Sequence, residues 1–178
     1  MEVADFRAAH VHFELNVLIN DSFAAWFKRN SRERNDHGEW NGQNLNGLDV
    51  REILLAEHAE GAKFSLLNYL RGQTELCRVL VRATNFPYLK RYPQLVLPGP
   101  IAQKEGAAGY EVALNFNGVA FALMPRAASE IHGQDKFQLL SVNEAEEKAN
   151  PCRHLVARRN GRWQLTDTGL RELELLTY

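Results

Sequence analysis

Residues 154–170 read His-Leu-Val-Ala-Arg-Arg-Asn-Gly-Arg-Trp-Gln-Leu-Thr-Asp-Thr-Gly-Leu, and this stretch constrains the fold more than any other. The dipeptide Asn160-Gly161 favours a two-residue type I′ turn, because both residues tolerate a positive φ. A turn at this place joins two alternating strands in one register. The predicted cross-strand pairs are Val156 with Leu165, Ala157 with Gln164, Arg158 with Trp163, and Arg159 with Arg162.

This register gives the hairpin an apolar face and a basic tip. The apolar face consists of Val156, Trp163 and Leu165. We expect the stem of Arg158 to lie across the Trp163 ring in a cation–π contact. Arg159 and Arg162 oppose each other at the tip, where their repulsion at about 5 Å in water is only about 1 kcal/mol. An anion would relieve it, so Arg158, Arg159, Arg162 and Trp163 are predicted to bind an anion or a partner.

A helix is predicted directly after the hairpin. Thr166 is placed to cap it, Asp167 favours its positive end, and Leu170, Leu173 and Leu176 supply its apolar stripe.

Residues 154–176, with their Leu-Thr-x-x-Gly-x-x-x-Leu pattern, resemble the wing and closing helix of winged-helix DNA-binding domains. The resemblance implies a wing tip that touches phosphates through Arg159 and Arg162. The preceding segment departs from that family, because residues 143–150 carry three glutamates that would repel a phosphate backbone. These are Glu144, Glu146 and Glu147.

The composition limits the partners and the compartment. The chain has 178 residues and a formal net charge of −1, which provides no general attraction to nucleic acid or to an anionic membrane. It has no apolar run long enough to cross a bilayer, so no membrane association is expected. Cys77 and Cys152 have neither a CxxC nor a metal-type spacing, which favours a reducing, cytoplasmic location.

A second hairpin is predicted over residues 111–124, with Asn117-Gly118 in a type I′ turn. The expected pairs are Phe116 with Val119, Leu114 with Phe121, and Val112 with Leu123. All six large side chains would then share one face, and a shift of one residue would exchange the two faces.

The remaining elements are shorter. A helix capped by Asp21 or Ser22 is expected to run to about Lys28, followed by a mobile polar loop over residues 29–47. Asp49 and Glu52 fit a capping box for a helix ending near Gly61. Its buried stripe is predicted to be Val50, Ile53 and Leu54.

Leu66, Leu67 and Leu70 predict the next helix, which ends at Gly72. Residues 76–83 alternate as a strand. The segment that follows is predicted to be an extended crossing without a helix, because four prolines interrupt it. They are Pro87, Pro93, Pro98 and Pro100.

Residues 10–19 alternate with the period of a half-buried strand, although a long N-terminal helix also fits the spacing of their apolar residues. On a strand, His10, His12 and Glu14 project from one face as a potential site for zinc or another divalent metal. On a helix only His10 and Glu14 share a face. Solvated histidines are the alternative, and Asp36, His37 and Glu39 are candidates for further ligands.

These patterns predict an α+β protein with a mixed or antiparallel sheet, two Asn-Gly hairpins and several short helices. Residues 1–140 form the expected core, and residues 141–178 a helix-hairpin-helix segment packed on it as part of the same domain. We expect a non-enzymatic binding or regulatory protein that presents the C-terminal hairpin to a protein partner or a nucleic-acid backbone, with no cofactor. The alternative is a metal-dependent hydrolase or nuclease using His10, His12 and Glu14.

Overall fold

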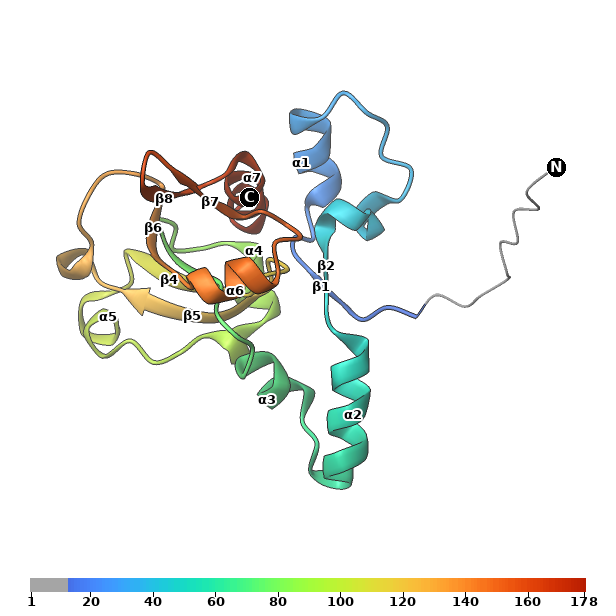
Figure 1. The fold of residues 1–178 in the computed structure, drawn as a ribbon. Helices are drawn as coiled ribbons and strands as arrows, with labels where there is room; N and C mark the ends of the chain where they lie inside the picture. Colours follow the sequence, from blue (N-terminus) through green and yellow to red (C-terminus); the bar gives the residue numbers. More distant parts are fainter. Residues whose placement is uncertain (1–12) are drawn as a thin grey trace.

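An antiparallel sheet of four strands lies at the centre of the computed structural model, which describes residues 13–178 (Figure 1). The strands are β3 (Cys77–Val81), β4 (Gly109–Leu114), β5 (Ala120–Arg126) and β6 (Phe137–Val142), in the order β5-β4-β3-β6. The described chain also contains helices, so the expected α+β class is confirmed. The sheet is antiparallel throughout.

Two smaller antiparallel sheets have two strands each. β1 (Asn16–Leu18) pairs with β2 (Leu45–Gly47), and β7 (Val156–Arg159) pairs with β8 (Arg162–Leu165). The strand interpretation is thus confirmed for residues 16–18, whereas residues 10–12 lie outside the described part of the chain.

Helices connect the strands. They are α1 (Phe23–Asn30), α2 (Val50–Glu60), α3 (Leu66–Arg71), α4 (Pro87–Arg91), α5 (Pro100–Glu105), α6 (Glu144–Ala149) and α7 (Asp167–Leu176). Short 3-10 turns occur at Gly38–Trp40, Gly42–Asn44, Gly61–Lys63, Pro93–Leu95 and Ala128–Glu130. Within residues 13–178, no helix has both the length and the apolar character needed to span a membrane.

Side-chain caps fix the starts of several helices, because the first N–H groups of a helix have no partner inside it. Asp49 accepts a hydrogen bond from the backbone N–H of Glu52 at 3.0 Å, as the capping box predicts. Ser22 precedes α1 without such a bond. Its own N–H instead donates to Oδ1 of Asn20 at 2.7 Å.

The prediction that the proline-rich segment contains no helix was wrong. Pro87 and Pro100 occupy the first positions of α4 and α5, and Pro93 begins a 3-10 turn. Proline is well suited to the first position, because its missing N–H would be unpaired there and its φ is already close to the helical value.

The predicted register of the β4–β5 hairpin was correct only in its outer part. Val112 pairs with Leu123 as expected, but Leu114 pairs with Ala120 rather than with Phe121. The register shifts by one residue between Ala113 and Leu114.

The side chain of Asn115 causes this shift. Its Oδ1 accepts hydrogen bonds from the N–H groups of Asn117 at 3.0 Å and Val119 at 2.9 Å. The turn therefore begins at Asn115, and the predicted pair of Phe116 with Val119 does not form. Gly118 has a φ of 85° but Asn117 has no positive φ, so the type I′ turn was also a wrong prediction.

Three further expectations needed correction. Residues 29–47 are not one loop, because they contain two 3-10 turns and β2, and they bury Asn44 and Asn46. Leu54 in α2 and Leu170 in α7 are 53% and 38% exposed, although both were assigned to buried stripes. Figure 1 shows that α2 extends away from the four-stranded sheet, and Ile53 is the residue that this helix buries.

One hydrophobic core joins segments from the whole described chain. It contains Val17, Ile19, Phe23 and Phe27 from the first segments, Val79, Val112, Phe121 and Leu123 from the sheet, and Leu155, Leu173 and Leu176 from the C-terminal segment. The β7–β8 hairpin and α7 therefore pack on the same core as the four-stranded sheet.

Replacing Phe121 by Ala tests this assignment. Phe121 is 6% exposed, so the change should lower the free energy of unfolding by about 3–5 kcal/mol, through lost burial and the cavity left behind. Urea unfolding measures it. Leu140→Ala is the control, since Leu140 is 42% exposed and its loss should cost no more than about 0.5 kcal/mol. Equal losses for both variants would contradict the core assignment.

Candidate functional site

The β7–β8 hairpin has the register that its Asn-Gly turn predicts. Val156 pairs with Leu165, Ala157 with Gln164, Arg158 with Trp163, and Arg159 with Arg162. Asn160 and Gly161 have φ values of 51° and 77°, as a type I′ turn requires. Both turn residues therefore agree with the twist of the strands that they join.

Arg158 and Trp163 do not form the predicted cation–π contact. The cation–π pairs found among residues 13–178 involve other side chains, and both Arg158 and Trp163 instead contact Glu144 of α6. The indole N–H of Trp163 donates to Oε1 of Glu144 at 2.8 Å, and Nη1 of Arg158 lies 3.9 Å from Oε2 of the same carboxylate. Glu144 thus ties the hairpin to α6 and neutralises one of its three arginines.

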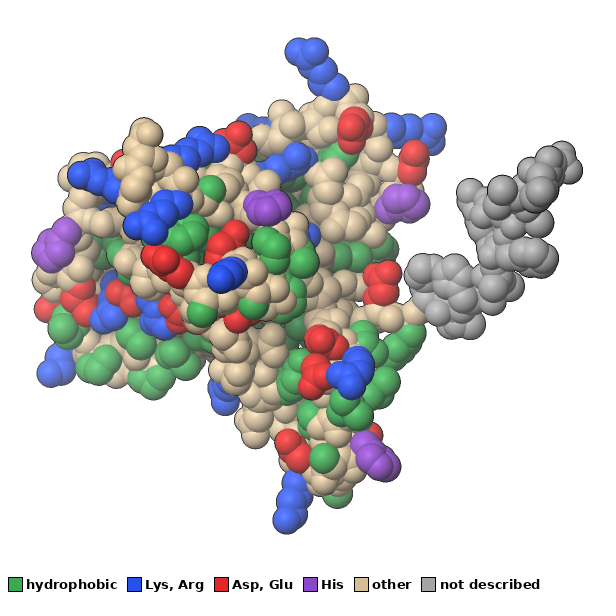
Figure 2. Space-filling model, in the orientation of Figure 1, with side chains coloured by type: hydrophobic (Ala, Val, Ile, Leu, Met, Phe, Trp, Pro, Cys, Tyr) green, Lys and Arg blue, Asp and Glu red, His purple; other side chains and the backbone are tan. Residues whose placement is uncertain are grey.

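Arg159 and Arg162 remain exposed at the tip. Neither has a carboxylate within 4.0 Å among residues 13–178. Figure 2 shows Lys and Arg side chains gathered over the β7–β8 hairpin, with Asp and Glu side chains beside them over the region of α6. The basic tip is therefore local, and it borders an acidic helix.

The base of the hairpin is fixed to the start of α7. The hydroxyl of Thr166 donates to the carbonyl oxygen of His154 and accepts from the N–H of Gly169 at 3.1 Å. A Cβ at position 169 would lie 2.1 Å from the carbonyl oxygen of Leu155. Only glycine therefore allows α7 to approach the first hairpin strand this closely.

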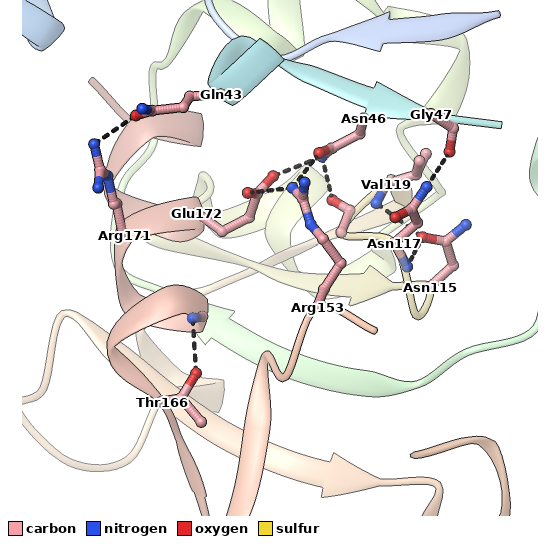
Figure 3. Close-up of polar contacts among 12 residues, drawn as sticks. Gln43, Asn46, Gly47, Asn115, Asn117, Val119, Arg153, Thr166, Arg171 and Glu172 are labelled. Carbon is pink, nitrogen blue, oxygen red and sulfur yellow. Dashed lines mark hydrogen bonds and ion pairs between the residues drawn. The ribbon is translucent and has the colours of Figure 1, made fainter. Parts of the chain in front are cut away.

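A buried polar network lies between this base and the N-terminal segments (Figure 3). Arg153 donates through Nη2 to Oε2 of Glu172 at 3.1 Å and to Oδ1 of Asn46 at 2.6 Å. Asn46 in turn donates to Oε1 of Glu172 at 2.6 Å and to the carbonyl oxygen of Gly118 at 2.8 Å. Four separate segments of the chain meet at these side chains.

The Glu172 carboxyl is almost fully buried, and its burial raises its pKa above the ordinary value. The hydrogen bond from Asn46 and the positive charge of Arg153 oppose this rise. Arg153 is less buried, with 28% of its side chain exposed. The pair therefore holds a buried carboxylate against an arginine that lies partly at the surface.

Sequence patterns did not identify Asn46, Arg153 or Glu172. The one available signal was the position of Glu172, which shares the i, i+3, i+4, i+7 stripe of Gly169, Leu173 and Leu176. A carboxylate on the buried face of a helix requires a partner. The sequence does not reveal that this partner is Arg153, since the pair forms only after the hairpin folds back.

The candidate metal residues are not brought together in the described part of the chain. His10 and His12 lie outside it, while Glu14 is exposed and accepts a hydrogen bond from Nδ2 of Asn16 at 3.2 Å. Asp36 pairs with Arg34 at 2.6 Å. Residues 13–178 contain no group of three or more His, Cys, Asp or Glu side chains placed to hold a metal. The metal site stays a prediction.

Cys77 and Cys152 are both free cysteines. Burial, together with the nearby Glu75 and Glu147 charges, raises the pKa of the Cys77 thiol to about 12, so this thiol is unreactive near neutral pH. Cys152 is exposed.

Comparison with known proteins yielded no match to any family model, curated protein or solved structure. The winged-helix resemblance of residues 154–176 therefore remains a prediction that rests on those residues alone.

The Glu172–Arg153 pair makes a pH-dependent prediction. Arg153→Met leaves the Glu172 carboxylate buried without its counter-ion and should lower the free energy of unfolding by about 3 kcal/mol near neutral pH. The folded state binds the Glu172 proton more tightly than the unfolded state does, and more so in this variant. Protonation of Glu172 at lower pH therefore stabilises the folded variant. The difference in the free energy of unfolding between parent and variant should shrink as the pH falls toward 5.

Urea unfolding at several pH values measures this difference between variant and parent. Arg158→Met serves as control, because its 3.9 Å contact with Glu144 is exposed and should contribute less than about 1 kcal/mol at every pH. A loss for Arg153→Met that is constant from neutral pH to pH 5 would contradict the assigned role of Glu172.

Proposed function

We propose that this chain is a binding or regulatory protein whose C-terminal hairpin engages an acidic segment of a protein partner. One observation carries the proposal. Arg159 and Arg162 are direct cross-strand neighbours at an exposed hairpin tip, and no carboxylate of the described chain lies within 4.0 Å of either.

The energetics of this tip favour an anionic partner. The two guanidinium groups repel each other, and a carboxylate placed between them removes that cost while gaining charge-assisted hydrogen bonds of about 1.5–3 kcal/mol each. The type I′ turn and the contact between Trp163 and Glu144 fix the strands beforehand. Less conformational entropy is then lost when a partner binds.

The surroundings of the tip favour a protein over a nucleic acid. The helix α6 beside the hairpin carries Glu144, Glu146 and Glu147, which would repel a phosphate backbone running past the tip. A protein partner can present one or two carboxylates at the tip and none opposite α6. The net charge of −1 also offers no general attraction to polyanions.

The two free cysteines support a reducing compartment. We therefore propose that the protein binds its partner in the cytoplasm.

The double variant Arg159→Ala/Arg162→Ala tests this function. Parent and variant, immobilised at equal density, are exposed to native-cell lysate, and the retained proteins and nucleic acids are quantified. We expect at least one protein that the parent retains and the variant loses, because both charge-assisted contacts are removed. The temperature of thermal unfolding should be unchanged or slightly higher in this variant, since the repulsion between the two arginines at the tip is also removed.

A matched control is Arg34→Ala/Arg51→Ala, which removes two exposed arginines that lie outside the hairpin. It should retain the same protein as the parent. If the tip variant retains every partner as well as the parent does, the proposed role of the tip is wrong. If it loses only nucleic acid, and the parental interaction weakens steeply with salt, the winged-helix reading replaces the protein-binding one.

A further inference from the structure

A groove runs along α7 on the side that faces α1. Three pockets of about 390, 350 and 280 Å³ form it, and Trp26 of α1 lines all three. Adjacent pockets share further residues, among them Arg171 and Glu174 of α7. We call this continuous surface the α1–α7 groove.

Three cations line the groove, and each lies over an aromatic ring. The guanidinium of Arg171 is 5.2 Å from the centre of the Trp26 ring, that of Arg29 is 5.9 Å from the Tyr178 ring, and the ammonium of Lys136 is 4.8 Å from the Phe137 ring. Cation–π contacts of this kind hold a charge in place without cancelling it.

The hydrogen bonds of these arginines are also made to neutral groups. Arg171 donates to Oε1 of Gln43 at 2.5 Å, and Arg29 donates to the hydroxyl of Tyr178 at 3.3 Å (the Gln43 contact is drawn in Figure 3). An amide, a hydroxyl and two aromatic rings therefore position these two guanidinium groups.

Several other arginines of the described chain form ion pairs. Four of them have a carboxylate oxygen within 4.0 Å of the guanidinium group: Arg78, Arg91, Arg126 and Arg153. In residues 13–178, no carboxylate oxygen lies within 4.0 Å of the charged groups of Arg29, Lys136 or Arg171. Arg71 and Arg82 also have no carboxylate within 4.0 Å in residues 13–178, but they donate to backbone carbonyl oxygens elsewhere on the described chain. Along the α1–α7 groove, three such cations lie on one surface, and all three are solvent-exposed.

We infer that the α1–α7 groove binds an acidic peptide segment of a partner protein. Asp167 and Glu174 also line the groove, and a continuous phosphate chain would pass close to both. A peptide can instead place its carboxylates at the cations and its backbone N–H groups at these two acids. The side-chain amide of Asn30 adds a further polar partner along the same wall.

This inference is independent of the hairpin tip, because none of the lining residues belongs to β7 or β8. The Arg153–Glu172 pair closes one end of the groove and cancels its own charge. Recognition therefore depends on Arg29, Arg171 and Lys136.

Fluorescence anisotropy with a synthetic peptide tests the inference. The probe is a fluorescein-labelled peptide in which glutamate alternates with glycine, and the same peptide with glutamine measures the contribution of charge. Arg29→Met/Arg171→Met keeps apolar packing on both rings and removes both charges. We expect it to weaken glutamate-peptide binding about tenfold or more.

Arg34→Met/Arg51→Met is the charge-matched control and should bind like the parent. Arg159→Met/Arg162→Met is measured beside it to show whether the peptide binds at the hairpin tip instead. Adding the peptide should shift the Trp26 indole N–H signal in an NMR spectrum of the parent. Absence of binding by the parent, or equal binding by the groove variant, overturns the inference. Loss of binding only in the tip variant assigns the peptide to the hairpin and also overturns it. If the parent binds a labelled oligothymidylate more tightly than the glutamate peptide, and this binding requires Arg29 and Arg171, the inference is overturned and the ligand of the groove is a nucleic acid.

Discussion

The buried contact among Glu172, Arg153 and Asn46 determines how the C-terminal segment is attached to the rest of the chain. A carboxylate at this depth is strongly disfavoured unless an opposite charge and hydrogen bonds surround it. Arg153 and Asn46 supply both, and Asn46 also holds the carbonyl oxygen of Gly118 in the β4–β5 turn. A Cβ on Gly118 would lie 3.2 Å from the Glu172 carboxylate. The turn, β2 and α7 therefore meet closely at this one buried cluster.

That arrangement separates charges that serve the fold from charges left at the surface. Arg78 and Arg126 both pair with Glu111 on the four-stranded sheet, and Arg158 lies near Glu144. These pairs hold strands and helices together. The arginines at the hairpin tip and in the α1–α7 groove are held by backbone geometry, rings and neutral acceptors instead, so their charge stays available. Both candidate surfaces therefore carry positive charge that has no carboxylate within 4.0 Å in residues 13–178.

The two hairpins show how far sequence reasoning reaches. The register of β7–β8 was predictable because Asn160 and Gly161 are themselves the turn, and both adopt the positive φ that a type I′ turn requires. In β4–β5 the dipeptide Asn117-Gly118 gave a wrong register near the turn. The amide oxygen of Asn115 accepts hydrogen bonds from two backbone N–H groups, and the turn therefore begins at Asn115. Local rules therefore succeed where backbone preference alone decides. They fail where a polar side chain takes the place of a backbone acceptor in the hydrogen bonds between two strands.

The candidate surfaces differ in the same way. The hairpin tip was visible in the sequence because Arg159 and Arg162 are three residues apart around a recognisable turn. The α1–α7 groove was not, because its arginines come from α1 and α7, near opposite ends of the described chain. Nδ2 of Asn20 donates to the carbonyl oxygen of Leu175 at 2.7 Å, which holds the segment before α1 against the last turn of α7. Gly169 fixes the first turn of the same helix to the hairpin base. The helix α7 thus contributes to both surfaces, because its last turn contacts the segment before α1 and its first turn packs on the hairpin base.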